Sequence, residues 1–527
     1  MREQPRAGPE QSGRQGGRQE DWQTREAARD MRVHLPWGRR ELGGDIMFLG
    51  IDLGTSGVKS ILIDGEQKLV AEAASRPLSV TRAHPGWSEQ DPSLWWDAVT
   101  ETLDALAASH PDKLAAVEGI GLSGQMYGAT VLGEDGKPLR QAILWNDTRT
   151  GAECRELEAA VPDLLDRVGR KPTPGVTASK LLWLRRHEPE LFARIHKVLL
   201  PKDYIRLRLT GEMVSDMADA SGTMWVDLAR RDWSDAMLAA CGLDRSHMPR
   251  LCEGTAVSGV LLPELASRWG MHRRPVIAGG GGDNACGACG TGVIEDGEGT
   301  VSLGTSGVLF VANNTPRNAG GAAIESLCHA VPDRWHQMSV VLSATSCLTW
   351  LSARLKKSPA ELAALVGDKP RPATDLLFVP FLDGCWSPRD DAAIRGGFLG
   401  LAHQHDDAAM AQAVMQGVAF AVLECANAFR ASGTDLKRLL AIGGGSRSRV
   451  WMSMLATSLG VELDLPEASE LGAAFGAARL GMIAASNMPP EAILKRPAIR
   501  GVVEPEAAFA ASYAQAFERW EAFTGLC

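Results

Sequence analysis

A six-residue segment occurs twice in the chain without change, as Leu53–Val58 and as Leu303–Val308. Each copy follows a short apolar stretch and precedes another, which predicts a strand, a tight glycine-rich turn and a second strand. Consecutive backbone N–H groups in such turns form anion-binding concavities, and glycine lets a ligand come close to the backbone. Because internal repeats indicate a repeated architecture, two copies far apart in the chain predict two related domains that hold one polyphosphate.

The composition is that of a globular protein with more than one domain. The chain has 527 residues, 45% of them hydrophobic, a net charge of −9 and a pI near 5.8. This acidic balance argues against nucleic-acid and anionic-membrane partners, and no apolar run approaches the roughly 20 residues that span a bilayer. Ten cysteines without a regular framework predict reduced thiols and a cytoplasmic protein. The oligomeric state stays open, with a homodimer as one candidate.

The first 46 residues differ from the rest of the chain. They are rich in Arg, Glu, Gln and Gly, poor in apolar residues and without periodicity, so residues 1–46 are expected to be a disordered N-terminal extension. Met47 stands directly before the first predicted strand and is expected to be the functional start.

Both halves alternate strands and helices after an initial hairpin, which predicts an α/β fold with a mixed sheet in each half. The expected division lies near residues 292–299, with an N-terminal domain over 47–295, a C-terminal domain over 296–490 and a helical tail over 491–527. The predicted strands of the first half are 48–52, 58–63, 69–74, 117–122 and 143–145, and its predicted helices are 94–108 and 149–160. The second half is predicted to hold strands around Leu303 and Leu309 and at 336–341, 376–379, 439–442 and 461–465, with helices at 345–355, 408–430, 449–459 and 468–484.

The residue before each repeat differs between the two copies. Asp52 precedes the first, whereas Ser302 precedes the second, so only the first loop has a carboxylate beside it. Mg²⁺ prefers oxygen ligands and usually shares the phosphates of a substrate. Asp52 is therefore a candidate metal ligand, and the alternative is an aspartate that caps the turn through its backbone.

Asp283 follows four consecutive glycines, Gly279 to Gly282, which end the apolar strand Val276–Ala278. An aspartate is a common helix N-cap, but four glycines are a costly way to build one because each loses much backbone entropy on folding. Close approach of a substrate explains them better. Asp283 is then a candidate general base that takes a proton from an attacking hydroxyl.

A third glycine-rich turn, Gly443–Ser446, lies between the strand 439–442 and the helix that starts at Arg449. Backbone N–H groups at such a junction favour phosphate. A triple glycine alone is weak evidence. Beside the two repeated loops it is the expected third wall of a nucleotide site.

The chain resembles the FGGY carbohydrate kinases from about Met47 to about Arg479, and most closely the bacterial members that phosphorylate D-xylulose. The matching segments are Gly50–Lys59, Trp87–Pro92, Leu144–Asp147, Leu200–Tyr204, Asp219–Trp225, Gly282–Ala285, Ser302–Gly307, Gly443–Ser448 and Gly472–Ala478. The resemblance implies two actin-like (ribonuclease H-like) domains with a cleft between them, closing on ATP and a sugar.

The resemblance also implies roles for particular residues. Asp283 is implied to be the catalytic base and Asp52 to act on Mg²⁺. The implied nucleotide-binding residues are Thr55, Ser56, Lys59, Gly304, Thr305, Gly444, Gly445 and Ser448. The sugar is implied to contact Gln125, Met126, Tyr127, Trp87 and Asp283.

Three departures from the family pattern bear on the sugar or, for the second of them, on interdomain closure. Tyr127 stands where the family usually has histidine, Cys385-Trp386 replaces Glu-Arg, and one extra glycine precedes Asp283. Phenol and imidazole differ in size and hydrogen-bonding capacity. The expected substrates are therefore D-xylulose first and, as alternatives, D-ribulose, L-ribulose or D-arabinitol. A nucleotide clamp that is not a kinase is the remaining alternative, and the sugar-side segments argue against it.

Overall fold

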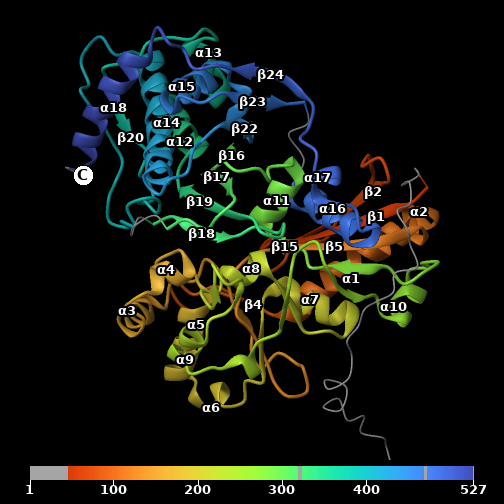
Figure 1. Cartoon of the computed structure of the whole chain (residues 1–527). Coiled ribbons are helices and arrows are strands. Elements are labelled where there is room, and N and C mark those ends of the chain that lie inside the picture. Colours follow the sequence, from red (N-terminus) through yellow and green to blue (C-terminus); the bar gives the residue numbers. More distant parts are fainter. Residues whose placement is uncertain (1–44, 319–322, 468–471, 526–527) are drawn as a thin grey trace, which may run out of the picture. The chain divides into compact units, whose positions relative to one another are not determined.

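The computed structural model describes residues 45–318, 323–467 and 472–525 (Figure 1). The predicted N-terminal extension, apart from its last two residues, lies outside this range. So do the first residues of the helix predicted over 468–484.

The first sheet has seven strands. Six follow one another in the order β13-β14-β5-β1-β2-β3, and the short strand β15 pairs with β5. β1 and β2 form an antiparallel hairpin, whereas β5 lies parallel to β1 on its other side. The bounds are β1 Met47–Leu53, β2 Val58–Asp64, β3 Leu69–Ala74, β5 Val117–Gly124, β13 Val257–Val260, β14 Val276–Ala278 and β15 Gly281–Gly282.

The second sheet repeats this arrangement. Its order is β18-β19-β17-β16-β22-β23-β24, with β16 and β17 as the antiparallel hairpin and β22 parallel to β16. The bounds are β16 Glu298–Leu303, β17 Gly307–Asn313, β18 Glu325–Cys328, β19 Trp335–Val341, β22 Arg438–Ile442, β23 Leu463–Pro466 and β24 Ile499–Val503. The repeated hairpin at the centre of both sheets confirms the prediction of two related α/β domains.

Helices and short strands complete the two halves. The helices of the first half are α1 Pro92–Ser109, α2 Pro111–Ala115, α3 Gly151–Ala160, α4 Leu164–Val168, α5 Thr177–His187, α6 Pro189–Phe192, α7 Pro201–Thr210, α8 Met217–Ser221, α9 Asp235–Ala240, α10 Pro263–Arg268 and α11 Asp283–Thr291. Those that follow are α12 Thr345–Leu355, α13 Pro359–Val366, α14 Asp407–Ala431, α15 Arg449–Leu459, α16 Ala473–Ser486, α17 Pro490–Ile493 and α18 Ala510–Thr524. The short strands are β4 Glu89–Gln90, β6 Thr130–Leu132, β7 Ala142–Ile143, β8 Lys197–Leu199, β9 Val214–Asp216, β10 Val226–Asp227, β11 Asp232–Trp233, β12 Arg250–Cys252, β20 Leu377–Val379 and β21 Gly397–Leu399.

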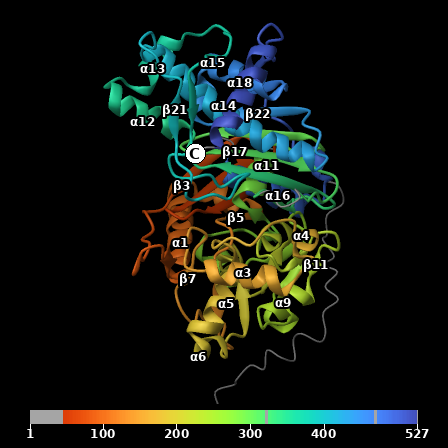
Figure 2. The ribbon, with the colours of Figure 1, turned by 90° about the vertical axis from the view of Figure 1, so that its left-hand side faces the viewer.

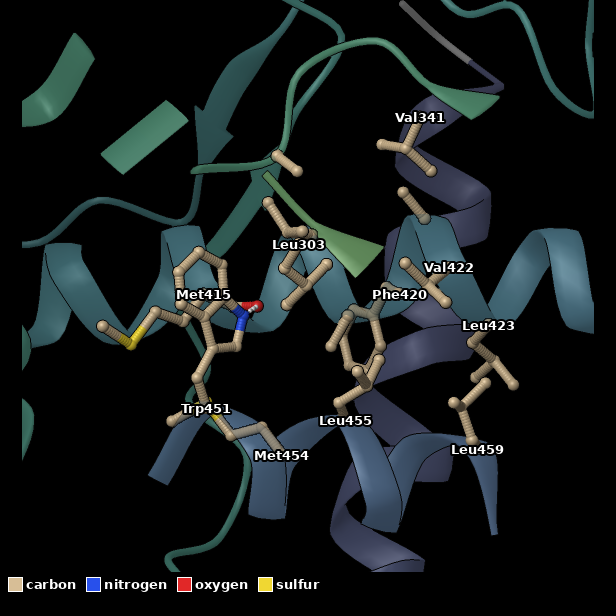
Figure 3. Close-up of a cluster of buried hydrophobic side chains, with 14 of the residues drawn as sticks. Leu303, Val341, Met415, Phe420, Val422, Leu423, Trp451, Met454, Leu455 and Leu459 are labelled. Atoms are coloured by element: carbon tan, nitrogen blue, oxygen red, sulfur yellow. Dashed lines mark hydrogen bonds between the residues drawn. The ribbon is translucent and has the colours of Figure 1, made fainter. Parts of the chain in front are cut away.

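The core of the second half is built around α14. Contrary to the expectation that no apolar run approaches the length that spans a bilayer, this helix is long and apolar enough to cross a membrane. However, 78% of its most apolar stretch is buried inside the protein. Figure 3 shows α14 side chains such as Phe420 meeting Leu455 of α15, and the Trp451 indole N–H donates to the Met415 carbonyl at 2.9 Å. α14 is therefore a core helix of this half.

Two segments in the last part of the chain, α16 and the residues after it, do not follow the division expected from the sequence. α16 comes from the second half of the chain, yet it packs on β1 and β5 of the first sheet and lies beside α11 (Figure 1, Figure 2). The segment expected as a helical tail contributes not only α18 but also β24, which is the edge strand of the second sheet. Dividing the chain at residue 295 therefore does not separate the elements that pack on the first sheet from those that pack on the second sheet.

Glycines on the first sheet explain where α16 lies. A Cβ atom on Gly121 would stand 1.7 Å from the Ala477 carbonyl oxygen, and one on Gly50 would stand 1.9 Å from that of Ala474. Only glycine, which has no Cβ atom, leaves room for such a backbone contact. The small residues of α16 complete the fit from the helix side, so the helix lies directly on the strands.

We expect Gly121→Ala to destabilise the fold by about 2 kcal/mol or more, because the new methyl group must push α16 away from β5. Chemical denaturation would measure this change. The matched control is Gly501→Ala in β24, where a Cβ atom would meet nothing within 4 Å. Equal stability of the two variants would contradict the close packing of α16.

Candidate active site

The register of three adjacent strands brings Asp52 and Asp283 to the same edge of the first sheet. Asp52 on β1 lies opposite Ser123 on β5, and Ser123 lies opposite Gly281 on β15. Gly282 follows Gly281, and Asp283 then begins α11. Because neighbouring strands are about 4.8 Å apart, the two carboxylates approach each other across a single intervening strand.

Asp52 is half-buried at this edge. Its Oδ1 accepts a hydrogen bond from the Ser123 hydroxyl at 2.8 Å. Burial raises the pKa of Asp52, while the Ser123 hydrogen bond and the Lys59 ammonium work in the opposite direction. Lys59 lies opposite Asp52 in the β1–β2 ladder, and it also pairs with Glu72 at 2.9 Å. The site therefore holds a carboxylate that lacks full solvation and would gain from a nearby cation.

Asp283 has a near-neutral pKa. Burial and then the charge of Asp52 raise the pKa of its carboxyl to about 7, although hydrogen bonds from Asn284 lower it. The N-cap of α11 is Gly282, so Asp283 does not serve as the cap. Its Oδ1 accepts from the Asn284 backbone N–H at 2.8 Å and from its side-chain amide at 2.9 Å. A carboxylate with this pKa is suited to take up a proton near neutral pH.

The glycines before Asp283 are each pressed against other parts of the site. A Cβ atom on Gly280, where φ is +76°, would lie 2.1 Å from the Leu122 carbonyl oxygen, and one on Gly282 would lie 2.7 Å from the Met126 side chain. The Arg206 guanidinium donates to the carbonyls of Ala278 and Gly279 from behind. The glycines therefore allow β15 to pack tightly between β5, Met126 and Arg206, and so set the position of Asp283.

A closed ring of hydrogen bonds links the first repeated loop to Gln125. The Thr55 hydroxyl donates to Gln125 at 2.9 Å, the Gln125 amide donates to Gln90 at 3.1 Å, and the Gln90 amide donates back to the Thr55 carbonyl at 2.8 Å. The indole of Trp145, which is 39% exposed, donates to the Thr55 hydroxyl at 2.9 Å. Thr55 is predicted to bind the nucleotide and Gln125 to bind the sugar. The hydrogen bonds therefore join these two residues in one rigid unit.

Met126 and Tyr127 continue from this ring towards the second half. Met126 packs against Gly282, next to Asp283. Tyr127 has φ of +66° and its ring lies against Gly222. Its hydroxyl donates to Glu325 at 2.7 Å, so this phenol engages a carboxylate of the second half of the chain.

Trp87 lies in a neighbouring cluster. The Arg149 guanidinium lies 3.5 Å from the Trp87 ring centroid, and Trp183 meets the same ring edge-on at 5.4 Å. Arg149 also pairs with Asp147, which accepts a hydrogen bond from the Ser88 backbone. The contacts of Trp87 are thus to this cluster, and its role at the sugar stays a prediction.

A cavity of about 570 Å³ opens in the second half between α12, α13 and the turn before α15. Gly444, Gly445 and Ser448, all predicted nucleotide residues, line it together with apolar residues of α13 such as Ala363. Ser448 also caps α15, since its hydroxyl accepts from the Trp451 N–H. The cavity has the size and the mostly apolar lining typical of a small-molecule site.

The second repeated loop adjoins this cavity. The carbonyl of Gly304 accepts from the backbone and the hydroxyl of Thr345, and that of Thr305 accepts from Ala344. Thr345 itself lines the cavity. Gly304 and Thr305 are thereby bonded to the start of α12, next to the cavity, whereas Ser56 and Lys59 are exposed on the first hairpin.

Comparisons with known proteins match this geometry to one family. The chain matches the N-terminal domain of the FGGY family of carbohydrate kinases over residues 47–290 and the C-terminal domain of that family over residues 299–485. The chain belongs to the FGGY family of carbohydrate kinases. It therefore has the two actin-like domains expected from the sequence.

Individual relatives are similar over almost their full length. The chain is 48% identical to the xylulose kinase of Escherichia coli over 84% of this chain and 90% of that protein. A crystal structure of a protein from Brucella ovis, described as a xyloylose kinase, superposes with a TM-score of 0.88 and 48% identity, covering 90% of this chain and 98% of that one. The xylulose kinase of Rhodospirillum rubrum superposes with a TM-score of 0.84 at 28% identity, covering 91% and 98%.

The donor set of this FGGY kinase is compatible with a magnesium ion. Within residues 45–318, 323–467 and 472–525, no cluster of three or more His, Cys, Asp or Glu forms a complete cage. Mg²⁺ in phosphoryl-transfer sites usually keeps waters and uses one or two carboxylates with the phosphates of the substrate. Asp52, half-buried and close enough to Asp283 to raise its pKa, offers one such carboxylate.

Several residues of the site were missed by sequence reasoning. Ser123 reaches Asp52, Gln90 and Trp145 reach the first loop, and Arg170 and Glu325 reach Tyr127. Gln90 and Trp145 lie in segments that match the family, which was an available signal. No sequence signal pointed to Glu325, because only the fold brings β18 next to Tyr127.

We expect Asp52→Asn to lower the pKa of Asp283 below about 7, because the substitution removes the neighbouring negative charge and keeps a similar shape. Carbon-13 NMR of aspartate-labelled protein would follow the titration. Asp112→Asn, an exposed substitution on α2, is the control and should leave the pKa of Asp283 unchanged. An unchanged pKa in Asp52→Asn would show that the two carboxylates do not interact.

Proposed function

We propose that this chain transfers the γ-phosphoryl group of ATP to D-xylulose and produces D-xylulose 5-phosphate. The observation that carries the proposal is the near-neutral carboxyl of Asp283, placed beside Asp52 at one sheet edge in a chain 48% identical to a xylulose kinase. A kinase of this type needs a base for the attacking hydroxyl and positive charge for the phosphates. Asp283 can serve as the base, and Asp52 can bind the cation that supplies the positive charge.

Asp283 would act as the general base. Its carboxylate accepts the proton of the terminal hydroxyl as the oxygen attacks the γ-phosphorus in line. With a pKa of about 7, the Asp283 carboxylate is a stronger base than an ordinary aspartate. At neutral pH the carboxyl is still ionised in about half of the protein molecules. Positioning and charge stabilisation supply most of the catalysis in phosphoryl transfer.

Asp52 would hold Mg²⁺ together with the phosphates of ATP. When bound, the ion supplies positive charge for the phosphoryl oxygens. Asp52 is oriented for this role by the Ser123 hydroxyl, which takes up one lone pair of Oδ1.

The nucleoside would occupy the cavity of the second half. Gly444 and Gly445 lie at the end of β22, where the backbone can come close to a flat base. The two glycine-threonine-serine loops, with Thr55, Ser56 and Lys59 on one side and Gly304 and Thr305 on the other, would bind the phosphates through their backbone N–H groups. The sugar would lie near Gln125, Met126 and Asp283, with Tyr127 and Trp87 behind them.

The remaining expectations concern the cell and the assembly. We infer a cytoplasmic enzyme from the ten cysteines without a regular framework. We infer that it has no nucleic-acid or membrane partners from the acidic composition. A homodimer is a further proposal that gel filtration with light scattering would test.

The first experiment is ADP release from Mg-ATP with D-xylulose, D-ribulose, L-ribulose, D-fructose, glycerol and D-arabinitol, each against a control without sugar. We expect strong stimulation by D-xylulose alone. Stimulation by another compound would contradict the assignment of D-xylulose as the substrate but support the kinase activity. An ATP turnover that no sugar changes would point to a nucleotide clamp.

We expect Asp283→Asn to lower kcat by at least about 100-fold, since general-base catalysis contributes about 10²–10⁴ in rate. Binding of ATP, followed by calorimetry, should persist because the nucleotide cavity lies in the other half. Asp112→Asn is the control for loss of one exposed carboxylate. Turnover close to that of the unmodified enzyme would remove Asp283 from the mechanism.

We expect Ala363→Phe to raise KM for ATP by about tenfold or more, because the ring would fill part of the cavity that a nucleoside needs. The KM for the sugar should change much less. The control is Leu365→Phe on the same helix, where the side chain is 46% exposed and lies outside the cavity lining. If both variants bind ATP normally, the nucleoside lies elsewhere.

A further inference from the structure

Glu325 reaches the sugar-side half of the protein from the second sheet. It begins β18, the edge strand of that sheet, and its Oε2 accepts the Tyr127 hydroxyl hydrogen bond at 2.7 Å. Its Oε1 pairs with Arg170 at 2.8 Å, and Arg170 also donates to the Tyr127 hydroxyl at 3.0 Å. The three side chains therefore form a closed triangle between the two halves.

All three members of this triangle are excluded from water. The Arg170 side chain is 2% exposed, that of Glu325 is 7% exposed, and Tyr127 is 6% exposed. A buried charge is costly unless it is paired and hydrogen-bonded. Because Arg170 and Glu325 come from different halves, each is compensated only while the halves remain together.

The first half holds Tyr127 rigidly. Its carbonyl accepts from the Lys180 ammonium at 2.7 Å and from the Thr177 hydroxyl at 3.1 Å. Its φ of +66° is uncommon for a residue with a side chain, and these two hydrogen bonds help to maintain it. The phenol is thus aimed at the second half by the backbone that also carries Gln125 and Met126.

The second half holds Glu325 equally firmly. β18 is paired with β19 over its whole length. Just before it, the Ala323 N–H donates to the Pro388 carbonyl at 3.0 Å, and the Ser387 hydroxyl donates to the Ala323 carbonyl at 2.7 Å. The loop with Cys385 and Trp386, which departs from the family pattern, therefore continues into residues that hold the chain just before β18.

The triangle adjoins the proposed site of the reaction. Met126, the neighbour of Tyr127, packs against Gly282, and the charge of Glu325 contributes to the raised pKa of Asp283. A change in the triangle would therefore reach both the sugar-side segment and the general base.

We propose that Tyr127, Arg170 and Glu325 form an interdomain latch, in which the phenol joins the sugar-side segment Gln125–Tyr127 to the nucleotide-side half. They are positioning residues, because they act by keeping the halves together. The identity of the two substrates in this scheme rests on the proposed function. When the joined state is only partly populated, the apparent affinity for every ligand that requires it falls by the same fraction.

The test uses Tyr127→Phe, Glu325→Gln and the double variant. Tyr127→Phe removes one hydroxyl and leaves the Arg170–Glu325 pair. We expect kcat/KM for D-xylulose and for Mg-ATP to fall together by at least about fivefold, because a buried hydrogen bond to a charged group is lost. We expect the radius of gyration with both ligands present, measured by X-ray scattering, to increase. The double variant should be no worse than the more affected single variant.

The matched control is Tyr513→Phe, the same chemical change at a buried tyrosine whose hydroxyl donates to the Arg371 carbonyl at 3.3 Å within the second half. It should change neither the radius of gyration nor either of the two kcat/KM values. Melting temperatures of all variants would separate a loss of folding from a loss of the latch.

Two results would overturn the proposal. A higher KM for the sugar alone, with an unchanged radius of gyration, would make Tyr127 a direct sugar contact. Additive effects of Tyr127→Phe and Glu325→Gln would show that the two side chains do not act together. If the unmodified protein phosphorylates none of the sugars, the proposed function fails, but the double-mutant cycle on unfolding free energy and the scattering data still decide for or against the latch.

Discussion

The close contact between α16 and the first sheet is the constraint on which the rest of the structure depends. Gly50 and Gly121 carry no side chains, so the backbone of α16 lies directly on β1 and β5. A third close contact, between Gly476 of α16 and the Cys286 carbonyl of α11, ties this helix to the element that begins at Asp283. A helix from the second half of the chain therefore fixes the strands and the helix that carry both carboxylates.

The site follows from strand register once this packing is in place. Asp52, Ser123 and Gly281 lie at one level of adjacent strands, so Asp283 arrives at the same edge as Asp52. Their proximity and burial keep the pKa of Asp283 near neutrality. The second sheet has the same strand pattern but places Ser302 and three glycines at the corresponding edge, which leaves room there for a ligand instead of a carboxylate.

Local signals in the sequence were sufficient for many of these features. The repeated loops predicted the two central hairpins. Strand ends beside glycine-rich turns singled out Asp52, Asp283 and the glycines that line the cavity of the second half. The division of the chain and the contacts of Tyr127 and Trp87 were harder to infer, because these depend on which helix covers which sheet. The neighbours of Tyr127 are the clearest case: Arg170 and Glu325 are far from it in the chain.

The sequence alone thus determined the fold class and the family and singled out Asp52 and Asp283 as candidate site residues, because glycine turns and strand ends are local patterns written in consecutive residues. Only the tertiary structure decided that α16 belongs with the first sheet, that Thr55 and Gln125 share one hydrogen-bonded ring, and that Glu325 meets Tyr127. No periodicity or motif in the sequence links the segments that these contacts join. Their energies come from close packing and from excluding water around paired charges, and neither exists until the chain has folded.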